Sequence, residues 1–114
     1  MHPTVMVVIR ENPMKTPRAV EALRIALGLG AGDNPLTVVL LDHAPSLLTD
    51  EIDDLVDVEI LEKHLPLFKE LQIPFVIAQG ARSRFTLDPA FNVREASKTE
   101  IASLIASTHR VLAF

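Results

Sequence analysis

The sequence predicts an α/β protein, a three-layer α/β/α sandwich built on a mainly parallel sheet of about five strands. Two observations lead to this fold class. Residues 5–9 and 37–41 are continuous apolar runs rich in β-branched side chains, which is typical of strands buried on both faces. Segments of helical period separate the apolar runs along the chain, and such alternation is typical of parallel sheets with right-handed crossovers. The 114 residues contain no linker, so we expect a single domain over residues 1–114.

In the first half of the chain, a strand over residues 5–9 is followed by a helix that begins at Thr16 and Pro17. A hydroxyl residue and then a proline is a typical helix start, and apolar side chains repeat at helical spacing to about Leu29. The glycines at 28, 30 and 32 follow this helix. A phosphate-binding loop would open a helix instead, so we interpret them as a helix stop.

The middle of the chain contains a second strand over residues 37–41 and two predicted helices. A short acidic helix is predicted within residues 44–57 and a longer one over residues 60–71. Pro66 falls inside the longer helix, where it removes a hydrogen bond and clashes with the preceding turn. We therefore expect a kink or a break there.

In the last part of the chain, residues 75–78 form a third apolar run, and residues 80–94 show no sustained period. Ser97 and Glu100 have the spacing of a capping box, which predicts a helix start. Residues 109–114 are predicted as the closing strand. Four strands are therefore evident from the pattern itself.

Composition narrows the function classes. A net charge of −4 argues against non-specific nucleic-acid binding. With no cysteine, the chain forms no disulfide, persulfide or thiolate metal site. It begins without a signal-peptide pattern, and its apolar runs are too short to cross a bilayer, so we expect a cytoplasmic protein without membrane contact. Apolar residues make up 48% of this short chain, which favours a homo-oligomer.

Polar residues follow the predicted strands, at the edge of the sheet where ligands bind in such folds. The candidate ligand-binding residues are Arg10, Asn12, Asp42, His43, Gln79, Arg82 and Arg84. Their guanidinium groups could hold a carboxylate, a phosphate or a sulfur oxyanion. The acidic cluster over residues 50–59 lacks the spacing of a calcium loop, and no two histidines have the spacing of a helical zinc pair. We assign no catalytic residue, metal or cofactor.

Three segments together resemble the DsrE/DsrF-like superfamily, which includes the TusBCD and DsrEFH assemblies. These segments are the helix start at residues 16–27, the strand and loop at residues 38–42, and the ending at residues 108–114. The resemblance implies a DsrEFH-like sandwich whose fifth strand lies within residues 80–94. It also implies oligomers, often trimers or hexamers, and complexes with DsrE/F-like paralogues. Sulfur-transferring members carry a cysteine near the end of the third strand, whereas residues 76–82 contain none here.

Three functional hypotheses follow from these patterns. The first is a non-catalytic, oligomeric binding or scaffold protein with a link to sulfur metabolism, unable to carry a persulfide itself. The second is a regulator that binds a small anion or a nucleotide at the strand ends. The third is an enzyme that uses Asp42 and His43, or Glu11, as acid–base groups, although the sequence shows no positioned partner for them.

Overall fold

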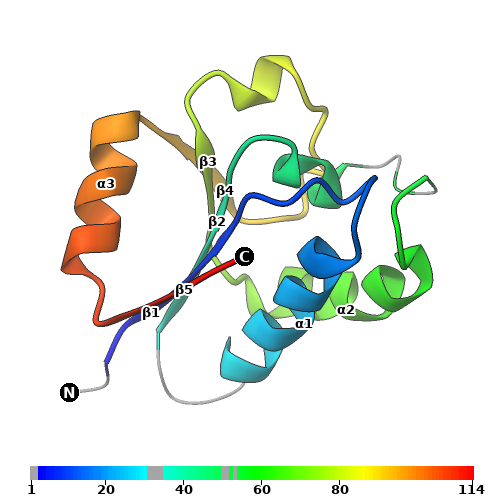
Figure 1. The fold of residues 1–114 in the computed structure, drawn as a ribbon, viewed down its shortest axis with the longest axis horizontal. Helices are drawn as coiled ribbons and strands as arrows, with labels where there is room; N and C mark the ends of the chain where they lie inside the picture. Colours follow the sequence, from blue (N-terminus) through cyan, green and yellow to red (C-terminus); the bar gives the residue numbers. More distant parts are fainter. Residues whose placement is uncertain (1–2, 31–34, 50–51, 53) are drawn as a thin grey trace.

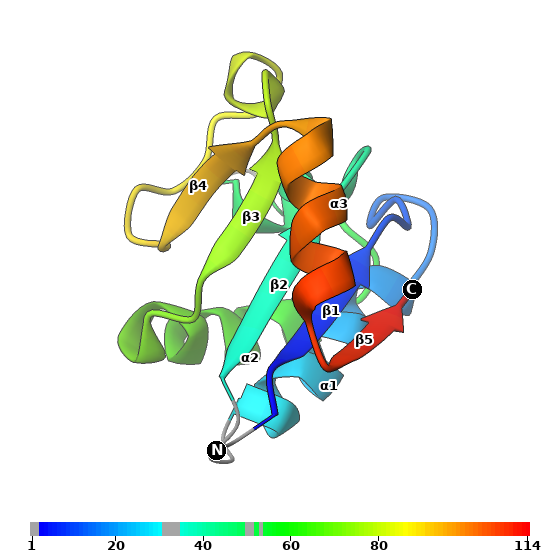
Figure 2. The ribbon, with the colours of Figure 1, turned by 90° about the vertical axis from the view of Figure 1, so that its left-hand side faces the viewer.

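The computed structural model describes residues 3–30, 35–49, 52 and 54–114. This part of the chain folds into a five-stranded sheet, in which every pair of neighbouring strands is parallel and the strand order is β4-β3-β2-β1-β5 (Figure 2). The elements are β1 (Val5–Ile9), α1 (Arg18–Gly30), β2 (Leu36–Leu40), the 3₁₀ helix η1 (Ala44–Leu48), α2 (Val58–Leu71), β3 (Phe75–Ala78), the 3₁₀ helix η2 (Ala81–Ser83), β4 (Val93–Ala96), α3 (Lys98–Ser107) and β5 (Arg110–Ala113). The predicted fold class is confirmed.

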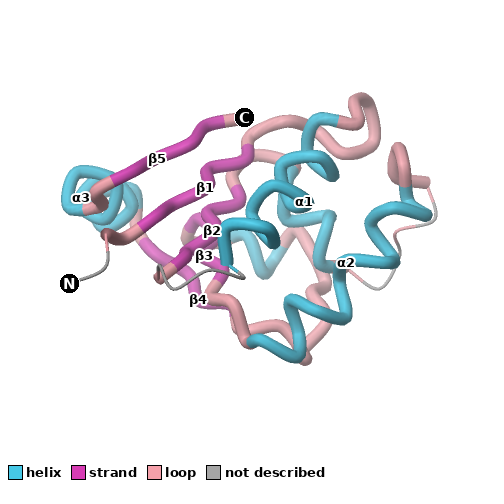
Figure 3. The backbone as a smooth tube through the Cα atoms, turned by 90° about the horizontal axis from the view of Figure 1, so that it is seen from below, coloured by secondary structure: helices cyan, strands magenta, loops and turns pink. Residues whose placement is uncertain are grey.

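Helices cover both faces of the sheet. α1 and α2 lie on one face and α3 on the other, so the molecule has three layers (Figures 1 and 3). The side chains of a strand alternate between the faces. In β1, Val5, Val7 and Ile9 belong to the core under α1 and α2, whereas Met6 and Val8 belong to the core under α3. This double burial explains why the strands are continuous apolar runs.

The larger core lies between the sheet and the two helices α1 and α2. Leu23 of α1 and Leu61 and Phe68 of α2 are completely buried there. The ring of Phe68 lies 5.4 Å from that of Phe75 on β3, and Phe91 meets Phe75 edge-on at 5.9 Å. The segment between η2 and β4 thus contributes an aromatic side chain to this core, which helps to hold it beside α2.

The smaller core is closed by α3 alone. Ile101 of α3 is buried against a set of strand side chains from the same face of the sheet. These strand residues are Met6, Val8, Val39, Val76 and Ala96. Because no second helix covers this face in the described part of the chain, the position of α3 determines how well this side of the sheet is shielded (Figure 2).

The strand register places the ends of β1, β2 and β3 at one edge of the sheet. Ile9 pairs with Leu40, and Leu40 pairs with Ile77. The residues that follow these strands therefore emerge side by side, as expected for a parallel sheet.

Two local predictions need correction. The region predicted to contain a short acidic helix contains instead the 3₁₀ helix η1 and, over residues 54–57, turns and a bend. Residues 50, 51 and 53 of that prediction lie outside the described residues. Of the kink or break expected at Pro66, the break does not occur, since α2 continues through this residue. Pro66 is exposed, so the carbonyl group that loses its helical donor can be hydrated.

The fifth strand, which was expected within residues 80–94, is β4. It begins at Val93, near the end of that segment, and continues to Ala96. No helix in the described part of the chain is long and apolar enough to cross a membrane.

Candidate functional site

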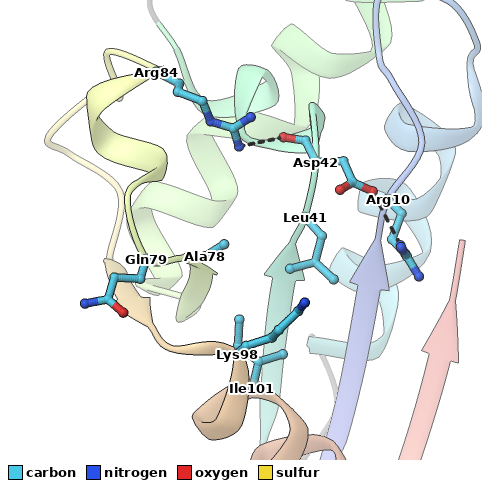
Figure 4. Close-up of a pocket in the computed structure, with 8 residues that line it drawn as sticks. All are labelled: Arg10, Leu41, Asp42, Ala78, Gln79, Arg84, Lys98 and Ile101. Carbon is cyan, nitrogen blue, oxygen red and sulfur yellow. Dashed lines mark hydrogen bonds and ion pairs between the residues drawn. The ribbon is translucent and has the colours of Figure 1, made fainter.

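A cavity of about 480 Å³ opens at the carboxyl edge of the sheet (Figure 4). The ends of β1, β2 and β3 and the first turn of α3 surround it. Its lining residues are Arg10, Leu41, Asp42, Ala78, Gln79, Arg84, Lys98 and Ile101. This is the position at which open α/β sheets bind ligands.

Asp42 organises the side of the cavity that follows β2. Its backbone has a φ of 56°, a left-handed conformation that aspartate tolerates better than most residues. Its carboxylate lies 3.5 Å from Nε of Arg10, and its backbone carbonyl accepts a hydrogen bond of 3.4 Å from Nη2 of Arg84. Asp42 therefore fixes an arginine on each side of itself (Figure 4).

The cavity carries more positive than negative charge. Arg10, Arg84 and Lys98 line it, and Asp42 is the only carboxylate among its lining residues. Arg10 is paired with that carboxylate. Within the described part of the chain, Arg84 and Lys98 form no ion pair, so two cationic groups face the cavity without a matching acid.

Lys98 is held at the cavity by the start of α3. The side chain of Ser97 accepts a hydrogen bond of 3.1 Å from the backbone N–H of Glu100, and the Glu100 carboxylate accepts one of 3.1 Å from the backbone N–H of Ser97. The predicted capping box is thus formed. Hydrogen bonds from the backbone N–H and then the hydroxyl of Ser97 lower the pKa of Glu100. Figure 4 shows the Lys98 side chain extending from this turn towards Leu41.

The remaining wall of the cavity is apolar. Leu41, Ala78 and Ile101 lie between the charged groups, and Ile101 is buried. A pocket with an apolar floor and a few polar groups that fix orientation is typical of small-molecule sites. Its chemistry suits a small, negatively charged molecule with an uncharged portion.

The structure brings together only part of the predicted site. Arg10, Asp42, Gln79 and Arg84 line the cavity, although the Gln79 carboxamide points away from Lys98 (Figure 4).

Three predicted residues lie elsewhere. Asn12 accepts a hydrogen bond of 3.0 Å from the backbone of Met14 and so closes a turn. His43 is exposed at the start of η1. Arg82 donates 2.8 Å to the Val93 carbonyl group, and its backbone N–H donates 3.1 Å to the Glu95 carboxylate. None of the three is among the residues that line the cavity.

Four lining residues were not among the predicted site residues, namely Leu41, Ala78, Lys98 and Ile101. Leu41 and Ala78 are apolar residues at the strand ends, whereas Lys98 and Ile101 belong to a helix start. The signal that could have found them is the capping box, since it places Lys98 at the first helical position directly after β4. No group of three or more metal-ligating side chains occurs in the described ranges.

The comparisons with known proteins support the fold. No protein-family model and no curated protein matches the sequence. The chain is similar in structure to the ychN protein from E. coli, with a TM-score of 0.78 over 98% of this chain and 99% of that one, at 18% sequence identity. This likeness supports the DsrE-like fold that the sequence resemblance implied.

Proposed function

We propose that this protein is a non-catalytic binding protein with a DsrE-like fold that takes a small anion in the cavity at the carboxyl edge. The observation that carries the proposal is the pair of cations, Arg84 and Lys98, that face the cavity without a matching acid. Guanidinium and ammonium groups bind carboxylates, phosphates and sulfur oxyanions through charge-assisted hydrogen bonds.

The absence of cysteine excludes a persulfide on this chain, so a role in sulfur metabolism would involve binding an anion or a partner. The ligand panel should therefore include sulfite, thiosulfate and sulfate beside phosphate, acetate and adenosine monophosphate.

Acid–base catalysis by Asp42 and His43 receives less support. The Asp42 carboxylate is paired with Arg10, and His43 is not among the residues that line the cavity. A general base needs to lie within hydrogen-bond reach of its substrate.

Isothermal titration calorimetry with the panel tests the proposal. We expect one of the anions to bind, and Lys98→Met or Arg84→Met to weaken that binding roughly tenfold to a hundredfold, the value of one charge-assisted hydrogen bond. The matched control is Lys15→Met, since Lys15 is exposed and is not among the residues that line the cavity. Binding that is unchanged in both cavity variants, or no binding across the panel, would refute the proposal. Turnover of a bound anion by the pure protein would show that the protein is an enzyme and would refute the non-catalytic role.

A further inference from the structure

α2 carries a second apolar stripe that its own core does not use. Leu61, Leu65 and Phe68 face the core and are buried. Of the six exposed large apolar side chains in the described ranges, three also lie on α2, namely Ile60, Leu67 and Leu71, with exposed fractions of 41%, 42% and 53%. One helix thus holds half of these exposed apolar residues.

The exposed residues have the spacing of a helix-pairing seam. Ile60, His64, Leu67 and Leu71 follow one another at intervals of four, three and four residues, which is the spacing of the contact positions of a coiled coil. His64 lies within the stripe and is half-buried. The stripe is therefore one continuous line along the helix and not a scatter of unrelated apolar residues.

The charged residues beside this stripe can form ion pairs between two copies of α2. Lys63 and Glu70 lie along its solvent side, one residue before His64 and one before Leu71. Neither takes part in an ion pair within the described residues. If two copies of α2 cross in antiparallel orientation, Ile60 faces the partner's Leu71 and His64 faces the partner's Leu67. Lys63 then lies beside the partner's Glu70, and the symmetry of the arrangement repeats that pair.

We propose that this stripe is a two-fold interface between copies of the chain, in which α2 packs antiparallel against the partner's α2. The occupant is a second copy because the same segment supplies both the apolar seam and both signs of flanking charge. A parallel pairing would put Lys63 and Glu70 of the two copies on opposite flanks of the seam, so the Lys63–Glu70 pair between copies can form only in the antiparallel orientation. This contact does not involve the cavity or a bound anion. If other surfaces also join copies of the chain, the two-fold contact doubles the number of copies in the assembly.

Disulfide trapping tests the geometry directly, because the chain has no cysteine of its own and each introduced thiol is unique. We expect mixtures of Ile60→Cys with Leu71→Cys, and of His64→Cys with Leu67→Cys, to form cross-linked heterodimers on mild oxidation. The matched control, Ile60→Cys mixed with His64→Cys, should not cross-link, since a disulfide needs Cα atoms within about 7 Å. Cross-links of Ile60→Cys with itself, or of Leu71→Cys with itself, would overturn the antiparallel arrangement, and no cross-links would overturn the interface.

Association measured by sedimentation tests the energetics. We expect Leu67→Glu to halve the mass of the assembly, whereas Met14→Glu, at an exposed apolar residue outside α2, leaves it unchanged. Lys63→Glu alone should weaken association about tenfold by placing two carboxylates together, and the combination with Glu70→Lys should restore it. An unchanged mass for Leu67→Glu, a failure of the charge swap to rescue, or a monomeric wild-type protein would each refute the interface. The circular dichroism of the variants checks that they are folded.

Discussion

Replacing Ser97 with alanine removes the cap on which α3 depends. The substitution deletes the acceptor of the 3.1 Å hydrogen bond from the backbone N–H of Glu100. The other hydrogen bond of the capping box, from the backbone N–H of residue 97 to the Glu100 carboxylate, can remain. Loss of a hydroxyl N-cap costs about 1 kcal/mol of unfolding free energy. For a domain of this size, that loss lowers the melting temperature by about 4 °C.

Urea unfolding followed by circular dichroism measures this loss. Ser97→Asp keeps an acceptor at the cap and should remain close to the wild type. Ser107→Ala is the matched control at the other end of α3, where the hydroxyl donates to the Leu104 carbonyl group and its loss should cost only a few tenths of a kcal/mol, as is usual on the surface. Equal destabilisation by Ser97→Ala and Ser107→Ala would refute the assignment of the cap.

The effect should also depend on pH. Hydrogen bonds from Ser97 lower the pKa of Glu100 below its ordinary value of 4.5 in the folded protein. The charged form of Glu100 is therefore favoured by folding, so its stabilisation is present above pH 4.5 and is lost as the pH falls through the lowered pKa. We expect the difference between wild type and Ser97→Ala to shrink in that acidic range.

Three further predictions concern the rest of the fold. Phe68→Ala should cost about 3–5 kcal/mol in urea unfolding, because a completely buried ring is deleted from the larger core; a loss below about 1 kcal/mol would contradict that packing. The side-chain hydrogen bond from Lys69 lowers the pKa of Asp88. Nζ of Lys69 lies 2.7 Å from Oδ2 of Asp88. Stability from this pair is therefore present above the usual aspartate pKa and declines as the pH falls through the lowered value, a decline that should be smaller in Lys69→Met. Gly80 has a φ of 90°, so Gly80→Ala should lower the melting temperature by several degrees, corresponding to about 1 kcal/mol, whereas Gly28→Ala in α1 should not.

Buried strands and helix caps could be predicted from the sequence because their signals are local. Residues 5–9 and 75–78 are strands with the predicted bounds, because short apolar runs rich in β-branched residues are typical of strands shielded on both faces. Ser97 and Glu100 form the capping box that their spacing predicted. β4 escaped detection because this edge strand reads Val-Arg-Glu-Ala and only Ala96 is buried, so neither the alternating nor the continuous pattern is present.

The composition of the site was only partly predictable, because side-chain direction depends on local hydrogen bonds. The strand-end rule placed Arg10 and Asp42 at the carboxyl edge, where both line the cavity. It could not tell that Arg82 turns back towards β4 while Arg84 turns towards Asp42. The two arginines are separated by one residue, and the short helix η2 decides which of them reaches the cavity.

The position of β5 has a consequence for how fast the chain folds. β1 is synthesised first, yet one of its two neighbours is the last strand, and Val5 pairs with Arg110 across almost the whole sequence. Closing so long a loop costs conformational entropy before any contact offsets it, and α/β topologies rich in distant pairings fold roughly in milliseconds to seconds. β1, in which all five residues are buried, therefore waits longest for its second neighbour, and until β5 arrives its open edge is the part of the nascent sheet most exposed to pairing with another chain.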